Sequence, residues 1–279
     1  MKSTPDHSVS NGDAPARGVE FRVLGPVTAI NDGTVIPLDE PEQRMLLAVL
    51  LSRPNQPIST DELIEAVWGA KPAATARDKL HQYLSELGHL LDGAIIRDDA
   101  GYRFEVDEER LDSLRFESLV RSGREVLAED PSAALDRLTK ALALWSGLAF
   151  EDLRDQPLLI DEIERLEELR LVAIEDRIEA DLAIGSHGEV IDDLESLVRE
   201  YPHRERLRAQ LMLALYRADR QSDSLRVYRQ TQRLLGEELG VDPSPALQAL
   251  EQQILNQDPA LDVQVPINAS ETVLFFVDL

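Results

Sequence analysis

The first apolar segments of the chain are short runs rich in β-branched residues. Two such runs occupy residues 21–24 and 27–30, and a third occupies residues 35–38. Asn31, Asp32 and Gly33 lie between the second and the third run, and these residue types tolerate the positive φ angles of tight hairpin turns. The pattern therefore predicts a small antiparallel sheet near the start of the chain.

The apolar period then becomes that of helices. Ser59 and Glu62 form a capping box that opens the second of three predicted helices, and Gly69 ends it. The inward faces consist of Leu46, Leu47, Leu50 and Leu51 in the first helix, Leu63, Ile64, Val67 and Trp68 in the second, and Leu80, Tyr83, Leu84, Leu87 and Leu91 in the third, which spans residues 74–91. Residues 95–97 and 102–106 predict a closing hairpin. This is the element order of an OmpR-type winged helix, whose third helix enters the major groove and whose hairpin is the wing.

After Asp107 every segment has helical periodicity. Turn residues divide this half into predicted helices at 112–128, 132–145, 157–184, 188–200, 204–219, 222–238 and 245–256. The apolar pattern also repeats with an offset of 34 residues, so that Ile191 corresponds to Leu225 and Leu194 to Tyr228. That period is typical of tetratricopeptide repeats (TPR), in which helix pairs stack.

The expected fold class is therefore mainly α with a small β content. A winged helix-turn-helix domain is followed by an all-α, TPR-like helical repeat domain. We expect a disordered tail at 1–18, the winged helix at 19–107, the helical domain at 108–259, and a linker at 260–279 with the possible start of a truncated further domain.

Composition excludes several classes of protein. The chain has no cysteine, which rules out disulfides and thiolate metal sites, and it has no apolar run long enough to cross a bilayer. The start of the chain lacks a signal-peptide pattern, so we expect a cytoplasmic protein with no membrane contact. It has no glycine-rich phosphate loop, no catalytic triad order and no histidine spacing suited to zinc. We therefore expect no enzyme activity, catalytic residue, cofactor or metal.

Many ordered motifs resemble those of SARP regulators, the pathway activators of antibiotic biosynthesis in actinomycetes and their relatives. In the winged helix these motifs are residues 42–51, 60–69, 74–77 and 101–103. In the helical half, where the family carries a bacterial transcriptional activation domain, they are 115–116, 145–148, 167–171, 202–206, 212–217, 218–221, 238–244 and Leu250. The resemblance covers roughly residues 19–259. It implies binding of double-stranded promoter DNA at direct repeats, homodimerisation and activation through the helical domain, and contact with RNA polymerase.

The expected recognition helix departs from the family pattern. Members of the family typically carry Ser-Arg-Leu-Arg-Arg, whereas this chain has Ser85-Glu-Leu-Gly-His89. Residues 19–107 contain 8 Lys or Arg against 15 Asp or Glu, and the whole chain has a net charge of −24. Fewer phosphate contacts reduce counterion release and hence affinity. Glu86 is expected to repel phosphate, although a glutamate can also read cytosine N4.

The candidate DNA-binding residues lie on the third helix and on the wing. They are Arg77, Lys79, His81, Gln82, Ser85 and His89 on the helix, with Arg97 and Arg103 on the wing. Gln82 is suited to adenine, and Arg77 to phosphate or guanine. The alternative interpretation is ordinary solvated helix surface, and it applies to Arg77, Lys79, His81 and His89. Trp68 and Trp145 are expected in the core.

Two features leave an alternative function open. The acidic recognition helix favours a protein-interaction or sensor module with a weakened DNA-binding head. The C-terminal run 272–279 resembles the first strand of a class III nucleotide cyclase domain, in which Asp278 would hold a metal ion. On that interpretation the chain is a fragment of a larger regulator.

Overall fold

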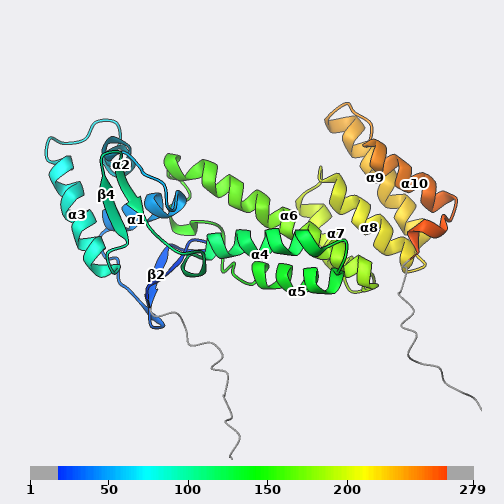
Figure 1. Cartoon of the computed structure of the whole chain (residues 1–279). Coiled ribbons are helices and arrows are strands. Elements are labelled where there is room, and N and C mark those ends of the chain that lie inside the picture. Colours follow the sequence, from blue (N-terminus) through cyan, green and yellow to red (C-terminus); the bar gives the residue numbers. More distant parts are fainter. Residues whose placement is uncertain (1–17, 263–279) are drawn as a thin grey trace, which may run out of the picture. The chain divides into compact units, whose positions relative to one another are not determined.

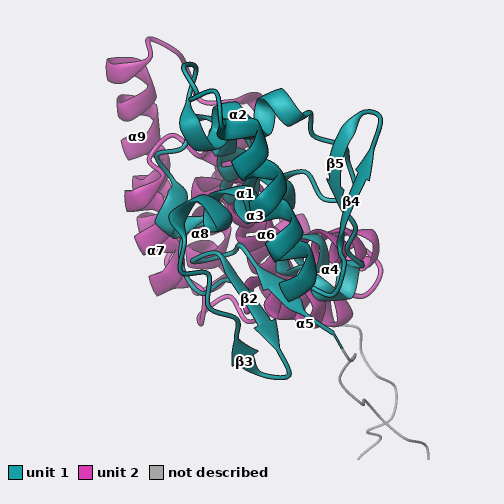
Figure 2. Cartoon of the chain, turned by 90° about the vertical axis from the view of Figure 1, so that its left-hand side faces the viewer, with its two compact units in different colours: residues 1–116, 144–167 teal, residues 117–143, 168–279 magenta. Residues whose placement is uncertain are grey.

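The computed structural model describes residues 18–262, and these divide into two compact units (Figures 1 and 2). The first unit contains the described residues up to Phe116 together with Leu144–Glu167. The second contains Glu117–Ala143 and the residues from Glu168 onward. The predictions for the tail before Gly18 and for the strand near Asp278 concern residues outside the described range.

The first unit begins with the predicted antiparallel sheet. Its strands are β1 (Glu20–Arg22), β2 (Thr28–Asn31) and β3 (Thr34–Val35), in the order β1-β2-β3. Asp32 and Gly33 have φ angles of 48° and 78°, which confirms the predicted turn. Strand β3 is shorter than the run 35–38 suggested, because Pro37 has no N–H group to donate to a ladder.

The three predicted helices of this unit are confirmed as α1 (Pro41–Ser52), α2 (Thr60–Trp68) and α3 (Ala76–Leu90). Helix α1 lies at the centre and is buried along most of its length. The capping box is formed: the Glu62 N–H donates to the Ser59 hydroxyl at 3.2 Å, and the Ser59 N–H donates to the Glu62 carboxylate at 3.0 Å. Gly69, with a φ of 72°, ends α2.

Strands β4 (Ile95–Asp98) and β5 (Gly101–Phe104) form the predicted hairpin. Ile58, two residues before α2, pairs with Tyr102 through two backbone hydrogen bonds of 2.8 and 2.9 Å. Gly101 allows this close approach, because a Cβ there would lie 2.1 Å from the Ile58 carbonyl oxygen. The hairpin is thereby fixed to the loop that leads into α2.

Asp112, the first residue of α4 (Asp112–Val126), anchors the start of that helix to the sheet. Its carboxylate accepts hydrogen bonds from the backbone N–H groups of Val23 and Leu24 at 2.9 to 3.0 Å. Burial outweighs these hydrogen bonds and raises the pKa of Asp112 to about 6. Phe116 and Trp145 pack edge to face nearby, with ring centroids 5.3 Å apart.

The prediction that both tryptophans are core residues overestimated their burial. Trp68 and Trp145 are each only partly buried. Trp68 is the last residue of α2, and its ring stacks on Tyr83 of α3 with a centroid distance of 6.4 Å. A flat ring near a helix end has one packed face and one open face, so helical periodicity alone overstates its burial.

The second unit is all helical. The helices after α4 are α5 (Pro131–Leu142), α6 (Ile160–Ile184), α7 (Ile191–Glu200), α8 (Glu205–Arg217), α9 (Gln221–Glu238) and α10 (Pro245–Leu255), of which α6 begins in the first unit. Short 3₁₀ turns occur in the first unit at Glu108–Arg110, Glu151–Leu153 and Pro157–Leu159, and in the second unit at Pro259–Leu261. Each of the seven helices predicted beyond Asp107 is present, with ends shifted by up to three residues.

Helices α7 to α10 form two consecutive helical pairs around one apolar core. Ile191, Leu194 and Tyr228 are buried in this core and Leu225 is partly buried, as the 34-residue correspondence predicted. Helices α8 and α9 are also joined by polar contacts, since the Ser224 hydroxyl donates to a carbonyl of α8 at 2.8 Å. The mainly helical fold class with a TPR-like second half is confirmed.

A buried ionic network joins α4, α6 and α8 within the second unit. Glu175 and Asp176 of α6 have side chains only 2% and 3% exposed. Arg204 contacts Glu175 at 2.9 Å, Arg206 contacts Asp176 at 2.6 Å, and Arg124 contacts Asp176 from α4 at 3.0 Å. Buried carboxylates require such partners, so this network fixes the three helices to one another.

Candidate nucleic-acid interface

Helix α3 has a buried face and an exposed face. Ala76, Leu80, Leu84 and Leu87 are its buried residues, and the helix contacts both α1 and α2. The period of 3.6 residues places Gln82, Ser85 and His89 on the opposite side, and all three side chains are exposed. The structure thus brings three of the predicted residues together in one row along the outer face of α3.

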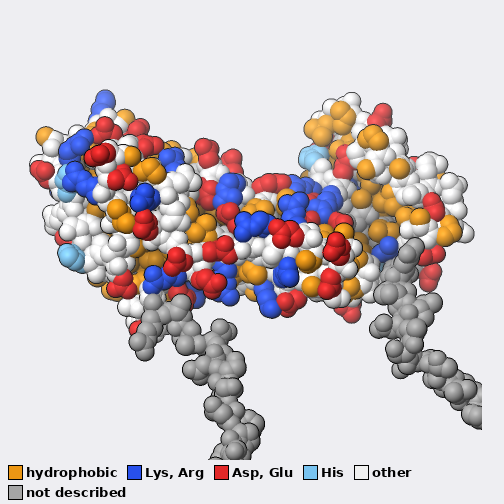
Figure 3. Space-filling model, viewed as in Figure 1, with side chains coloured by type: hydrophobic (Ala, Val, Ile, Leu, Met, Phe, Trp, Pro, Cys, Tyr) orange, Lys and Arg blue, Asp and Glu red, His pale blue; other side chains and the backbone are white. Residues whose placement is uncertain are grey.

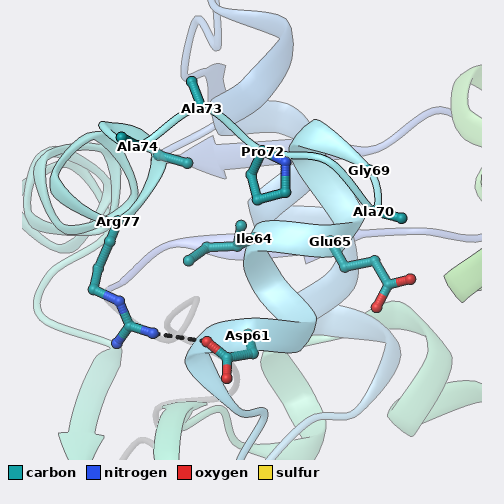
Figure 4. A pocket seen from close by; sticks show the side chains of 10 residues that line it. Asp61, Ile64, Glu65, Gly69, Ala70, Pro72, Ala73, Ala74 and Arg77 are labelled. Atoms are coloured by element: carbon teal, nitrogen blue, oxygen red, sulfur yellow. Dashed lines mark hydrogen bonds and ion pairs between the residues drawn. The ribbon is translucent and has the colours of Figure 1, made fainter.

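Lys79 and Arg77 flank this row on different sides. Lys79 is exposed and has no carboxylate of residues 18–262 within ion-pair distance. Arg77 instead turns toward α2, where its guanidinium lies 2.7 Å from the Asp61 carboxylate. Figure 4 shows this ion pair beside an open pocket in the connection between α2 and α3, which is lined by small side chains such as Ala73 and Ala74. The volume of this pocket is about 510 Å³.

The wing contacts α3 through an aromatic side chain. The buried ring of Tyr102 lies 6.2 Å from the His81 ring, and the Arg97 guanidinium lies 5.7 Å from the Tyr102 ring centroid. His81 is therefore half-buried and separate from the exposed row, whereas Arg97 is exposed on β4. Arg103 of β5 pairs with Glu105 at 2.7 Å and with Asp98 at 3.6 Å.

The sequence did not reveal the surroundings of Glu86. Both of its carboxylate oxygens accept hydrogen bonds within the protein, from the Gln82 amide at 2.9 Å and from the Gln43 amide of α1 at 2.7 Å. Gln43 is 8% exposed. The sequence places Gln43 at the start of the apolar helix α1, which could have indicated a buried amide in need of a hydrogen-bond partner. It did not indicate that this partner is Glu86.

The surface around the exposed row of α3 is electrostatically mixed. Basic and acidic side chains intermingle on the face of the molecule seen in Figure 3. Partial burial, together with the negative charges of Glu42, Glu40 and Glu86, raises the pKa of Tyr83. Among the predicted residues, Lys79 and Arg97 are exposed cations without carboxylate partners in residues 18–262, and they lie beside a negative field at the start of α1.

The described residues contain neither a metal-binding cluster nor a membrane-spanning helix. No group of three or more His, Asp or Glu side chains between residues 18 and 262 is arranged to hold a metal ion. None of the helices in this range is both long and apolar enough to span a membrane.

Comparisons with known proteins agree with this architecture. The profile of the bacterial transcriptional activator domain matches residues 111–255. The regulatory protein AfsR of Streptomyces coelicolor is 42% identical over 246 residues, which cover 87% of this chain and 25% of AfsR. The transcriptional regulatory protein MoaR1 of Mycobacterium tuberculosis is 36% identical over 270 residues, covering 93% of this chain and 87% of MoaR1.

A solved structure shares the fold. It is that of Mycobacterium tuberculosis EmbR in complex with a low-affinity phosphopeptide, with a TM-score of 0.82 and 36% identity over 88% of this chain and 66% of that one. The chain spans about a quarter of the length of AfsR and about two thirds of EmbR. The profile match covers about half of the chain, and the match to MoaR1 extends over nearly the whole of both proteins. The chain therefore belongs to the SARP family of transcriptional regulators that carry a bacterial transcriptional activator domain.

Proposed function

We propose that the chain is a transcriptional activator that binds promoter DNA through the winged helix of its first unit. One observation carries this proposal: α3 exposes a row of polar side chains, Gln82, Ser85 and His89, beside a hairpin placed as a wing. A recognition helix of this kind reads base edges in the major groove while neighbouring cations contact phosphates. Its relatives are named as regulators, and we propose no catalytic role.

The phosphate contacts we propose come from Lys79 and Arg97 first, because neither is held by a carboxylate of the described residues. Arg77 and Arg103 are engaged in ion pairs at the surface. Exposed ion pairs contribute only about 0–1 kcal/mol, so a phosphate can replace the carboxylate at small cost. His81 then acts through the wing rather than by direct contact with DNA.

The remaining roles follow from the domain organisation that we propose, with DNA reading in 19–107 and activation in 108–259. A single winged helix with few free cations binds weakly, whereas a homodimer on two repeats gains affinity by avidity. The helical domain would mediate this dimerisation and contact RNA polymerase. Promoter DNA lies in the bacterial cytoplasm, which is where we place the protein.

Fluorescence anisotropy tests the DNA-binding proposal. The full chain is titrated against a labelled promoter duplex from its own genomic neighbourhood, over a range of salt concentrations, with random duplex as competitor. We expect sequence-specific binding that weakens steeply with salt and weakens further in Arg77→Ala. Lys140→Ala is the matched control, because Lys140 is an exposed cation of the second unit paired with Asp136.

Binding no tighter than to random duplex, even at low salt, would refute the proposal for this chain alone. The alternative of a protein-interaction module with a disabled DNA-binding head would then take its place.

A further inference from the structure

Three side chains from two helices form a hydrogen-bonded chain that ends on the exposed row of α3. Gln43 of α1 donates to Glu86 Oε2 at 2.7 Å, and Gln82 donates to Glu86 Oε1 at 2.9 Å. Gln43 is almost fully buried, whereas Glu86 and Gln82 are exposed. The buried amide therefore holds the carboxylate, and the carboxylate holds the exposed amide.

The chemistry of these groups fixes which way the Gln82 amide faces. An ionised carboxylate is an acceptor only, so the Gln82 side-chain nitrogen, and not its oxygen, must face Glu86. One N–H of Gln82 is used in this contact. The second N–H and the carbonyl oxygen remain available, and they are the donor and acceptor that pair with N7 and N6 of adenine in the major groove.

Holding the amide in advance also lowers the cost of binding. A free glutamine side chain loses rotamer entropy when it is ordered. Glu86 restricts Gln82 before DNA arrives, so less of this cost remains at the moment of contact.

We propose that Glu86 is a positioning residue, which orients Gln82 so that the protein selects adenine at one base pair of its DNA site. This inference rests on the proposed DNA-binding function. It gives a function to Glu86, which stands at a position where related recognition helices carry arginine. A glutamate there weakens phosphate contacts, and that effect alone gives the residue no positive function.

Removal of Glu86 should change two measurable quantities in opposite directions, the general affinity for duplex DNA and the discrimination at one base pair, so the two can be separated. Removal of its negative charge reduces repulsion of phosphate, so affinity for any duplex should stay equal or rise. Loss of the hydrogen bond frees Gln82, so discrimination at one base pair should fall. A purely electrostatic role changes only the first quantity, and a purely structural role changes the stability of the winged helix.

The experiment begins with selection from a randomised duplex library by the full wild-type chain. Duplexes that differ from the selected site at single base pairs are then compared in competition with wild type, Gln82→Ala, Glu86→Ala and Glu86→Gln. We expect wild type to prefer A·T at one position by about tenfold, as one bidentate contact provides. Gln82→Ala and Glu86→Ala should both lose that preference, while Glu86→Ala binds random duplex at least as tightly as wild type.

Two controls keep the result specific. Glu86→Gln removes the charge but keeps an acceptor oxygen, so it should retain part of the preference. Asp78→Ala removes an exposed carboxylate from the same helix and leaves the hydrogen bond between Gln82 and Glu86 in place, so it should raise general affinity and leave the adenine preference intact. Circular dichroism of each variant confirms that α3 is still folded.

The possible failures are distinguishable. A wild-type chain that selects no sequence refutes the proposed function, and this inference falls with it. A wild-type chain that selects a site, with Glu86→Ala keeping the full adenine preference, refutes the positioning role alone.

Discussion

Replacement of Arg204 by methionine tests whether the ionic network of the second unit is essential for its stability. Arg204 donates from Nε to Glu175 at 2.9 Å and from a terminal nitrogen to the other carboxylate oxygen at 3.3 Å. Methionine keeps much of the aliphatic stem and removes the guanidinium. Glu175, only 2% exposed, would then retain Arg206 as its ionic partner, at 3.4 Å.

The magnitude follows from this geometry. Removal of one partner from a buried ion pair costs about 3–5 kcal/mol, because the other charge remains buried without compensation. Arg204 is itself 27% exposed and Arg206 remains nearby, so the lower end applies, about 3 kcal/mol. Lys140→Met is the matched control: its ion pair with Asp136 has side chains 65% and 60% exposed, and its loss should cost about 0.5 kcal/mol.

Urea denaturation of the full chain measures the effect. Far-ultraviolet circular dichroism follows the helices of both units, whereas tryptophan fluorescence follows the first unit, which contains both Trp68 and Trp145. With an m value of about 2 kcal/mol/M, the circular dichroism midpoint of Arg204→Met should fall by roughly 1.5 M. Lys140→Met should shift it by less than a third of that amount.

The double variant Arg204→Met with Glu175→Gln separates charge from packing. Without the carboxylate charge, loss of the guanidinium should cost less, giving a coupling energy of at least about 1 kcal/mol. The reasoning is refuted if Arg204→Met destabilises no more than Lys140→Met, or if the two substitutions are additive.

Three further predictions concern the first unit. The pKa of Asp112, about 6 against an ordinary 3.8, means that the folded chain binds this proton more tightly. Its contribution to stability should therefore be lost as pH rises from about 4 to 6, by up to about 3 kcal/mol, and Asp112→Asn, measured by tryptophan fluorescence in urea, should lack this change. An unchanged pH profile in the variant contradicts the assignment. Ser59→Ala removes the capping-box acceptor and should lower the unfolding free energy by about 1 kcal/mol in the same assay, whereas a neutral result argues against the cap. Lys79→Ala should weaken binding to specific and random duplex alike and reduce the slope of log affinity against log salt by about 0.9, and an unaltered slope excludes a phosphate contact.

Much of the fold follows from the pattern of apolar positions. The period of 3.6 residues identified each α-helix that the structure describes between Asp107 and residue 262, and Ser59 with Glu62 marked the start of α2 at the correct residue. Turn residues marked the hairpin at Asp32 and Gly33. These features are local, since each depends on neighbours within a few positions and on which face of an element is buried. The exposed row on α3 is of the same kind, because burial of Leu80, Leu84 and Leu87 leaves the opposite face outside.

The tertiary structure decided which polar groups meet. Gln43 and Glu86 are 43 residues apart, and Asp112 lies 89 residues from Val23. Packing of α3 on α1, and of the start of α4 on the sheet, brings these groups within hydrogen-bond distance. Hydrophobic periodicity records how deeply a residue is buried, but a hydrogen bond depends on the positions of two particular atoms. The sequence thus determined the elements and their exposed faces, while Glu86 as the partner of Gln82 emerged only when the helices packed.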